Sequence, residues 1–155
     1  MNQLFFMWYL LENYNTDPAM KNLVNNQALY FIPVFNPDGF VYNQTIEPNG
    51  GGLQRKNRNV GTNSCGTTSN GIDLNRNSAY YWGNGGASGS LCSGTYRGSA
   101  PFSENETQIM RDFFLEHDFK ISLNHHSFKN SMLHAYAGVI RQTQDLMSTL
   151  SITMI

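Results

Sequence analysis

The amino-acid sequence predicts an α/β sandwich built on a mixed or mostly parallel sheet. Three observations support this fold class. Residues 3–14 carry a helix-like apolar pattern, and the run 28–35 is continuously apolar and of strand length. A second helix-like pattern over 103–117 leads directly into another strand-like run at 119–124. Helices that alternate with strands in this order are typical of α/β proteins.

The N-terminal part is expected to contribute one helix and one strand. Apolar residues cover most faces of the helix over 3–14, so it should be largely buried, and residues 15–18 should end it. The run 28–35 fits a strand that is buried on both faces. Pro33 lacks an amide N–H, which favours an edge or the end of that strand. The Asn-Pro-Asp-Gly sequence at 36–39 predicts a turn.

A long glycine-rich stretch over 43–101 follows and is predicted to be one loop. Loops of this length inside a compact domain are usually functional. In open α/β sheets, ligands gather beyond the C-terminal ends of the strands. This loop follows the strand at 28–35, and the pair His125 and His126 follows the strand at 119–124. Both features are therefore expected at the same edge of the sheet.

The helix near residue 105 is predicted from a start signal in the sequence. Ser103 at the N-cap and Glu106 at N3 form a predicted capping box. The helix is expected to run to about His117. Its inward-facing side chains are expected to be Ile109, Met110, Phe113 and Phe114.

The remaining C-terminal elements are shorter. Residues 119–124 predict a short strand, and residues 133–136 are expected to continue it or to pair with it. Residues 141–155 are expected to begin another helix. The predicted order is therefore helix, strand, long functional loop, helix, strand and helix.

Composition indicates one globular domain and excludes several classes of protein. The 155 residues include 40% hydrophobic residues, which is enough for a core. Ten basic and eleven acidic residues give a net charge of −1, so no nucleic-acid surface is expected. The apolar run 4–11 has no basic flank or cleavage site, so we expect neither a signal peptide nor a membrane span. Two cysteines, Cys65 and Cys92, are compatible with a disulfide or with free thiols.

Polar residues with possible chemistry lie in the long loop. Arg55 lies in a short basic cluster, and such clusters are usually solvated. Asn75 and Arg76 are adjacent and could receive a carboxylate, because the guanidinium fork binds both oxygens and the amide adds a donor. As a dipeptide alone, Asn-Arg is a weak signal.

Histidine 126 is a candidate metal ligand at the end of a strand. Neutral imidazole suits zinc, but adjacent strand residues point to opposite faces, so at most one of His125 and His126 serves a given ion. The sequence contains no HxxE, HExxH, HxH or CxxC pattern, and therefore no complete zinc motif. A Ser127, His126 and Asp73 triad is disfavoured, because no G-x-S-x-G elbow is present and Ser127 is adjacent to His126.

These segments together resemble the zinc carboxypeptidase family typified by the pancreatic carboxypeptidases, peptidase family M14. The resemblance runs from about residue 3 to at least residue 138, and it rests on the order of the motifs rather than on any one of them. The motifs are NPDG at 36–39, RKNR at 55–58, DLNRN at 73–77, GTYRG at 94–98 with FSE at 102–104, and HSF at 126–128.

The resemblance implies a fold and a reaction. The fold is a partial three-layer α/β/α sandwich with a mixed sheet, of the carboxypeptidase-like (phosphorylase/hydrolase-like) type. The reaction is release of C-terminal amino acids from peptides by zinc-activated water. The implied substrate is the C-terminus of a peptide or protein, with no nucleic-acid or membrane partner, and the longer parent protein is expected to be a monomer.

The resemblance also implies a role for individual residues. His126 matches the third zinc ligand, and Asp73 matches a carboxylate that orients a zinc-binding histidine. Arg55 matches the arginine that polarises the scissile carbonyl. Asn75 and Arg76 match the pair that binds the terminal carboxylate of the substrate. Ser127 and Phe128 are expected to line the substrate pocket, although the family often has tyrosine at the position of Phe128.

The two cysteines acquire a pairing from the same resemblance. Cys65 and Cys92 match a disulfide that closes the loop between them, which implies an oxidising compartment. Two N-glycosylation triplets, Asn43-Gln44-Thr45 and Asn105-Glu106-Thr107, fit a secreted or lumenal parent protein.

The chain lacks parts of the family pattern. The His-x-x-Glu motif that supplies two zinc ligands is absent, and no acidic residue matches the catalytic glutamate. Residues 1–155 are therefore expected to be a partial catalytic domain, with one of three zinc ligands, that is inactive and poorly stable alone. Two other functions remain open: a non-catalytic module that binds peptide C-termini, and a zinc amidohydrolase acting on small acyl amino acids.

Overall fold

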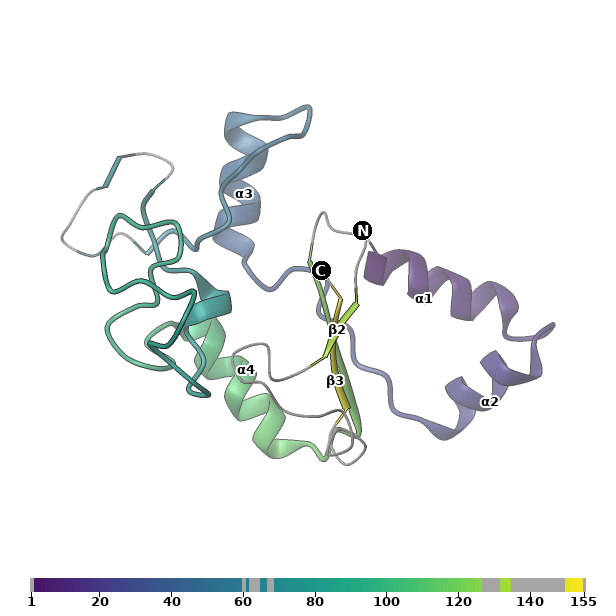
Figure 1. Ribbon diagram of the computed structural model, residues 1–155. Helices are drawn as coiled ribbons and strands as arrows, with labels where there is room; N and C mark the ends of the chain where they lie inside the picture. Colours follow the sequence, from purple (N-terminus) through teal and green to yellow (C-terminus); the bar gives the residue numbers. More distant parts are fainter. Residues whose placement is uncertain are drawn as a thin grey trace.

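The computed structural model describes residues 2–59, 61, 65–66, 69–126, 132–134 and 150–154 (Figure 1). No helix within these residues is long and apolar enough to cross a membrane. The helices are α1 (Asn2–Asn13), α2 (Pro18–Asn26), α3 (Pro37–Ile46), the 3-10 helix η1 (Leu74–Arg76) and α4 (Asn105–Glu116), and the strands are β1 (Ile121–His125), β2 (Met132–His134) and β3 (Leu150–Met154).

The helical hairpin α1–α2 opens the chain. The predicted first helix is confirmed and ends at Asn13, but a second helix follows where only a break was expected. Asp17 caps α2, since its Oδ1 accepts hydrogen bonds from the backbone N–H groups of Ala19 at 2.8 Å and Met20 at 3.4 Å. Pro18 occupies the first position of α2, where its missing N–H is not needed.

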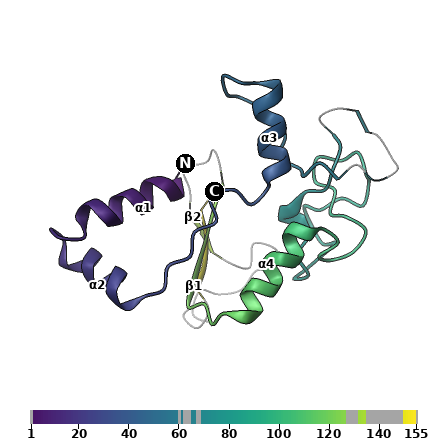
Figure 2. The ribbon, with the colours of Figure 1, turned by 180° about the vertical axis from the view of Figure 1, so that it is seen from behind.

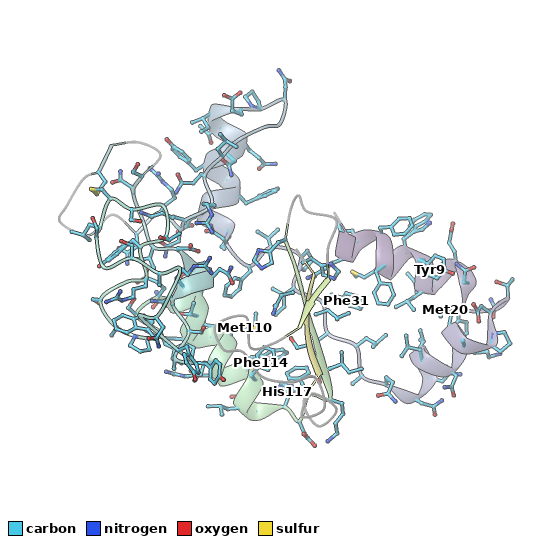
Figure 3. The ribbon with its side chains drawn as sticks, viewed as in Figure 1. Tyr9, Met20, Phe31, Met110, Phe114 and His117 are labelled. Carbon is cyan, nitrogen blue, oxygen red and sulfur yellow. A yellow bond between two sulfur atoms is a disulfide. The ribbon has the colours of Figure 1, made fainter. Side chains whose placement is uncertain are left out.

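The prediction that the first helix is largely buried is wrong. Leu10 is 3% exposed, whereas Phe5 is 70% and Leu11 is 72% exposed. The described residues place α2 against α1, and Figure 3 shows Tyr9 and Met20 at that contact. The segment before α3 also contacts α1, since the ring centroid of Phe31 lies 6.1 Å from that of Phe6, but these two contacts leave Phe5 and Leu11 exposed.

The strand predicted at 28–35 is also wrong. These residues run in an extended path without a hydrogen-bonded partner strand among the described residues. Pro33 contributes by lacking an amide donor. The segment packs through aromatic rings instead: the Tyr30 ring centroid lies 5.3 Å from that of Phe113 and 5.4 Å from that of Phe119.

The turn predicted at 36–39 is in fact the start of α3. Asn36 is the N-cap and its Oδ1 accepts a hydrogen bond from the Gly39 N–H at 3.0 Å, while Pro37 opens the helix. The Asn36 Nδ2 also donates to the Lys56 carbonyl at 3.0 Å. This helix shortens the predicted loop, which now extends from the end of α3 to α4.

The start of α4 differs from the prediction by one or two residues. Glu104 is the N-cap, without a side-chain capping bond, and the Ser103 hydroxyl donates to the Glu104 carboxylate at 2.7 Å. The predicted capping box is therefore wrong, because Ser103 is used elsewhere. The end at Glu116 agrees with the prediction to within one residue.

The inward face predicted for this helix is correct only in part. Ile109 is 69% exposed and Phe114 is 41% exposed, whereas Met110 and Phe113 are half-buried. Phe114 still contacts Phe119, with ring centroids 4.9 Å apart. Figure 3 shows Met110, Phe114 and His117 on the side of α4 that faces the sheet.

The sheet is mixed, with strand order β1-β3-β2. β1 pairs with β3 in parallel and β2 pairs with β3 antiparallel. The predicted strand at 119–124 is confirmed with shifted bounds, and β2 pairs with β3 rather than with β1. The helix predicted over 141–155 is wrong at 150–154, where Ile152 and Thr153 favour a strand. Residues 141–149 and 155 lie outside the described residues.

Helices lie on both sides of this sheet. Figures 1 and 2 show α1 and α2 on one side and α4 on the other, with the long loop and η1 beyond the N-terminal end of α4. β1 carries the chain from the C-terminal end of α4 to His125 and then to His126. The loop and the end of β1 are thus the two places from which a site can be built.

Candidate functional site

The 3-10 helix η1 presents the Asn75–Arg76 pair. Asp73 is its N-cap, and the Asp73 Oδ1 accepts a hydrogen bond from the Asn75 N–H at 3.1 Å. The Asp73 N–H donates to the Tyr96 carbonyl at 2.8 Å, which ties η1 to the loop's return segment. The Asp73 side chain is only 2% exposed, whereas Asn75 is exposed. The cap therefore fixes the backbone that holds the two candidate carboxylate-binding residues.

The Asp73 carboxylate brings two arginines together. Arg55 Nη1 lies 2.8 Å from Asp73 Oδ2 and also donates to the Gly94 carbonyl at 2.6 Å. Arg76 Nε lies 4.0 Å from the same Oδ2 and donates to the Gly86 carbonyl at 3.0 Å. The side chains of Arg55 and Arg76 are 51% and 33% exposed. Two guanidinium groups around one carboxylate leave a net positive charge, which attracts an anion.

His126 lies within electrostatic range of this cluster. Burial lowers the pKa of the His126 imidazole, Arg55 lowers it further, and Asp73 opposes them, while Arg76 adds a smaller lowering. These effects favour the neutral imidazole, the form that binds a metal ion. The predicted residues Arg55, Asp73, Arg76 and His126 are thus brought into one region.

The donor set fits one zinc ligand rather than a complete zinc site. No group of three His, Cys, Asp or Glu side chains that could hold a metal ion occurs within the described residues. His125 does not add to it, since neighbouring strand residues point to opposite faces. Its Nδ1 is buried without a hydrogen-bond partner in the described structure.

Three predictions about the site have separate outcomes. The Cys65–Cys92 disulfide is present, and the two cysteines are separated by 27 positions in sequence. Ser127 and Phe128, predicted to line the substrate pocket, lie outside the described residues. The described contacts of the Asp73 side chain are with Arg55, Asn75 and Arg76, so its role beside a zinc-binding histidine stays a prediction.

Lys56 anchors the disulfide loop and was missed by the sequence analysis. It is 1% exposed, and its Nζ donates to the carbonyls of Ser69, Leu91 and Ser93 at 2.5, 3.2 and 3.0 Å. Leu91 and Ser93 flank Cys92, so the ammonium and the disulfide hold the same strip of backbone. Burial lowers the pKa of the Lys56 ammonium, Asp73 opposes this, and Arg55 adds to the lowering.

A network of hydrogen bonds from buried side-chain amides connects the long loop to the start of α4. Asn57 is 2% exposed and its Nδ2 donates to Glu104 Oε2 at 2.8 Å. Its Oδ1 accepts from the Ile72 N–H at 2.7 Å. The same Glu104 Oε2 accepts from Asn59 Nδ2 at 2.8 Å. These bonds connect the segment that carries Arg55 to the segment that carries Asp73 and to the start of α4.

The close approach between Gly71 and Asn57 gives a stability prediction. Gly71 has φ +92°, and a Cβ there would lie 1.8 Å from the Asn57 carbonyl oxygen. Gly71→Ala is expected to lower the free energy of unfolding by at least about 3 kcal/mol, since backbone strain and a main-chain clash combine. Gly50 has φ +97° with no atom within 4 Å of its Cβ position. Gly50→Ala should therefore cost only about 1–2 kcal/mol. Denaturant unfolding compares the two, and equal losses would contradict the clash.

Comparison with known proteins identifies the family. A family model described as zinc carboxypeptidase matches residues 2–151. Carboxypeptidase A2 of Rattus norvegicus is 35% identical over 128 residues, which are 82% of this chain and 29% of that protein. Carboxypeptidase B of Rattus norvegicus is 36% identical over 138 residues, which are 86% of this chain and 32% of that protein. The chain therefore belongs to the zinc carboxypeptidase family, peptidase family M14, whose members are metalloproteases.

A solved structure supports the fold. The crystal structure of thrombin activatable fibrinolysis inhibitor matches with a TM-score of 0.73 and 29% identity, over 92% of this chain and 35% of that chain. The protein thus has part of the carboxypeptidase fold. It spans about a third of the length of the curated relatives it matches.

Proposed function

We propose that this chain is the central part of a zinc metallocarboxypeptidase, which releases C-terminal amino acids from peptides. The observation that carries the proposal is the cluster around Asp73. It places Arg55 and Arg76 on one buried carboxylate and within electrostatic range of His126. A peptide C-terminus offers one carboxylate and one carbonyl next to it, and two neighbouring guanidinium groups can serve these two oxygen-bearing groups separately.

Each residue has a proposed role. Arg76 and Asn75, both on η1, bind the terminal carboxylate of the substrate. Arg55 donates to the scissile carbonyl oxygen and stabilises the negative charge that develops there, an interaction that is strongest in the transition state. Asp73 fixes both arginines, and we propose that it also orients a zinc-binding histidine. Ser127 and Phe128 line the pocket for the released residue.

His126 is the proposed zinc ligand of this chain. Its lowered pKa keeps a nitrogen lone pair free at neutral pH. When bound, zinc supplies the Lewis acid that activates water in this family. Catalytic zinc takes three protein ligands, so His126 alone cannot hold it at useful affinity. We propose that the complete catalytic domain is a three-layer α/β/α sandwich with a mixed sheet, of which residues 1–155 form part.

A hydrolysis assay tests this proposal at two levels. The purified 155-residue chain is expected to release no amino acid from an N-blocked dipeptide, with or without added zinc. The complete protein that contains these residues is expected to release the C-terminal residue and to lose activity on chelation. Chelator-sensitive hydrolysis by the 155-residue chain would refute the proposed inactivity of the fragment. Cleavage of amidated and free-acid substrates at equal rates by the complete protein would refute the function.

The second candidate function is a non-catalytic module that binds peptide C-termini. It is favoured because His126 is the one proposed metal ligand in the part of the chain that the structure describes, and because the side chains of Arg55 and Arg76 are partly exposed. Peptide binding by the 155-residue chain that is unchanged by zinc or chelator would support it.

The location of the longer protein is also a proposal. The Cys65–Cys92 disulfide indicates an oxidising compartment, so we propose secretion or residence in a lumen. We further propose that it acts as a monomer on peptides or protein C-termini.

A further inference from the structure

Two N-glycosylation triplets occur in the described residues, and the structure treats them differently. Asn43-Gln44-Thr45 lies within α3, and Asn105-Glu106-Thr107 opens α4. In both, the residue between asparagine and threonine is not proline, so both satisfy the acceptor rule. The surroundings of the two asparagine side chains therefore decide which triplet is compatible with a glycan in the folded protein.

The Asn43 side chain is used by the fold. Its Oδ1 accepts a hydrogen bond from the Gln54 N–H at 2.8 Å, and its Nδ2 donates to the Gln54 carbonyl at 2.9 Å. A side-chain amide can pair with both the N–H and the carbonyl of one residue only through the Nδ2 hydrogen that lies on the same side of the C–N bond as its own oxygen. Gly52 is packed against the same amide, since a Cβ there would lie 2.4 Å from Asn43 Oδ1.

A glycan at Asn43 would remove this pairing. A glycosylated asparagine is a secondary amide, and such amides are planar and prefer the trans form. In that form the sugar carbon replaces the Nδ2 hydrogen on the side of Oδ1. This is the hydrogen that Asn43 donates to the Gln54 carbonyl. The sugar would also be directed at the Gln54 carbonyl. Attachment at Asn43 is thus incompatible with the described packing of α3 on residues 52–54.

The Asn105 side chain makes no comparable hydrogen bonds within the described residues. Asn105 is the first residue of α4 and is exposed, and its side chain makes no hydrogen bond within the described structure. The fixed member of this triplet is Thr107, which is 4% exposed and whose hydroxyl donates to Asn77 Oδ1 at 2.6 Å. A sugar on Asn105 Nδ2 therefore extends into solvent and breaks no bond of the fold.

We propose that Asn105 is an N-glycosylation site of this protein and that folded molecules carry no glycan on Asn43. The donor class is a lipid-linked oligosaccharide diphosphate. A bond forms between Asn105 Nδ2 and the first sugar carbon, the bond from that carbon to the diphosphate breaks, and Nδ2 loses one proton. The Cys65–Cys92 disulfide supports passage through an oxidising compartment, where this transfer takes place.

The test is expression of the chain behind a secretion signal in a eukaryotic host. Disulfide-bonded, soluble monomer is collected from medium and cell extract and treated with peptide N-glycosidase in heavy-oxygen water, which marks each glycosylated asparagine by mass. The expected result is a mark on the Asn105 peptide and none on the Asn43 peptide. A glycosidase-sensitive mobility shift should be present in the unsubstituted chain.

Two substitutions separate the triplets. Asn105→Gln is expected to abolish the mobility shift. Thr45→Ala removes the Asn43 triplet while it keeps the Asn43 side chain, and it is expected to leave the shift unchanged. A mark on Asn43 in the soluble monomer overturns the proposal, and so does an unmarked Asn105 peptide in both soluble and insoluble material. The insoluble material is informative because transfer precedes folding, so acceptor use at Asn105 is read even where the chain aggregates.

Discussion

Replacement of Asn77 by alanine is expected to lower the free energy of unfolding by about 3–5 kcal/mol. Asn77 is fully buried, at 0% exposure. Its Nδ2 donates to the carbonyls of Arg97 and Ala100 and to Ser103 Oγ, at 2.8, 3.1 and 2.9 Å. Its Oδ1 accepts from the Glu104 N–H at 3.3 Å and from the Thr107 hydroxyl at 2.6 Å. Alanine leaves several of these buried groups without a partner, and each costs about 1–3 kcal/mol.

Asn75→Ala is the matched control. It makes the same asparagine-to-alanine change two residues earlier, at an exposed position. It should change the free energy of unfolding by less than about 1 kcal/mol. Urea unfolding followed by circular dichroism compares the two variants with the parent chain. If the unsubstituted chain gives no folded baseline, the fraction of molecules with the Cys65–Cys92 disulfide is measured in place of urea unfolding. Similar losses for both variants would show that the Asn77 network does not hold η1 to α4.

The sequence predicted the elements whose signals are local. The helices near 3–14 and 105–116 have strong helical patterns, and the run before His125 is a short apolar stretch, so all three were found. The starts of α2 and α3 were misinterpreted, because Asp17-Pro18 and Asn36-Pro37 are equally compatible with a turn and with an N-cap followed by proline.

Elements that depend on distant partners could not be predicted in the same way. An apolar run such as 28–35 becomes a strand only if another strand offers it hydrogen bonds, and none does so within the described residues. Conversely, residues 150–154 pair with β1 and β2 as a strand, although a helix was expected over 141–155. The hydrophobic periodicity of a segment indicates which of its faces are buried. Whether the segment pairs as a strand depends on residues elsewhere in the chain.

The candidate site was predicted through the order of its motifs, and its geometry was not. Loop residues such as Lys56, Asn57 and Asn77 are polar, and polar loop residues are most often solvated. Their complete burial follows from the backbone carbonyls and amides that converge on them from segments more than 10 residues away. No local pattern encodes that convergence. The same limit applies to Asp73, whose contact with Arg55 spans 18 residues.

Arg76→Ala is expected to remove most of the preference for a free C-terminal carboxylate. A charge-assisted hydrogen bond contributes about 1.5–3 kcal/mol, so kcat/KM on a free-acid substrate should fall by about 10–100-fold in the complete protein. The rate on the matching C-terminal amide should change little, because that substrate never gains the charged interaction. Arg76→Lys should recover only part of the preference, since an ammonium cannot bind both carboxylate oxygens as the guanidinium fork does.

Arg111→Ala distinguishes this specific effect from the loss of any positive charge. Arg111 is 41% exposed, close to the 33% of Arg76, but it pairs with Asp112 on the outer face of α4. Its removal should leave the acid-to-amide ratio unchanged. An equal fall for both variants would mean that general electrostatic attraction, and not the η1 arginine, selects the carboxylate. An unchanged ratio in Arg76→Ala would move the selection to Arg55, the other guanidinium that Asp73 holds. The ratio therefore tests which of the two arginines has the proposed role of binding the terminal carboxylate and which has the proposed role at the scissile carbonyl.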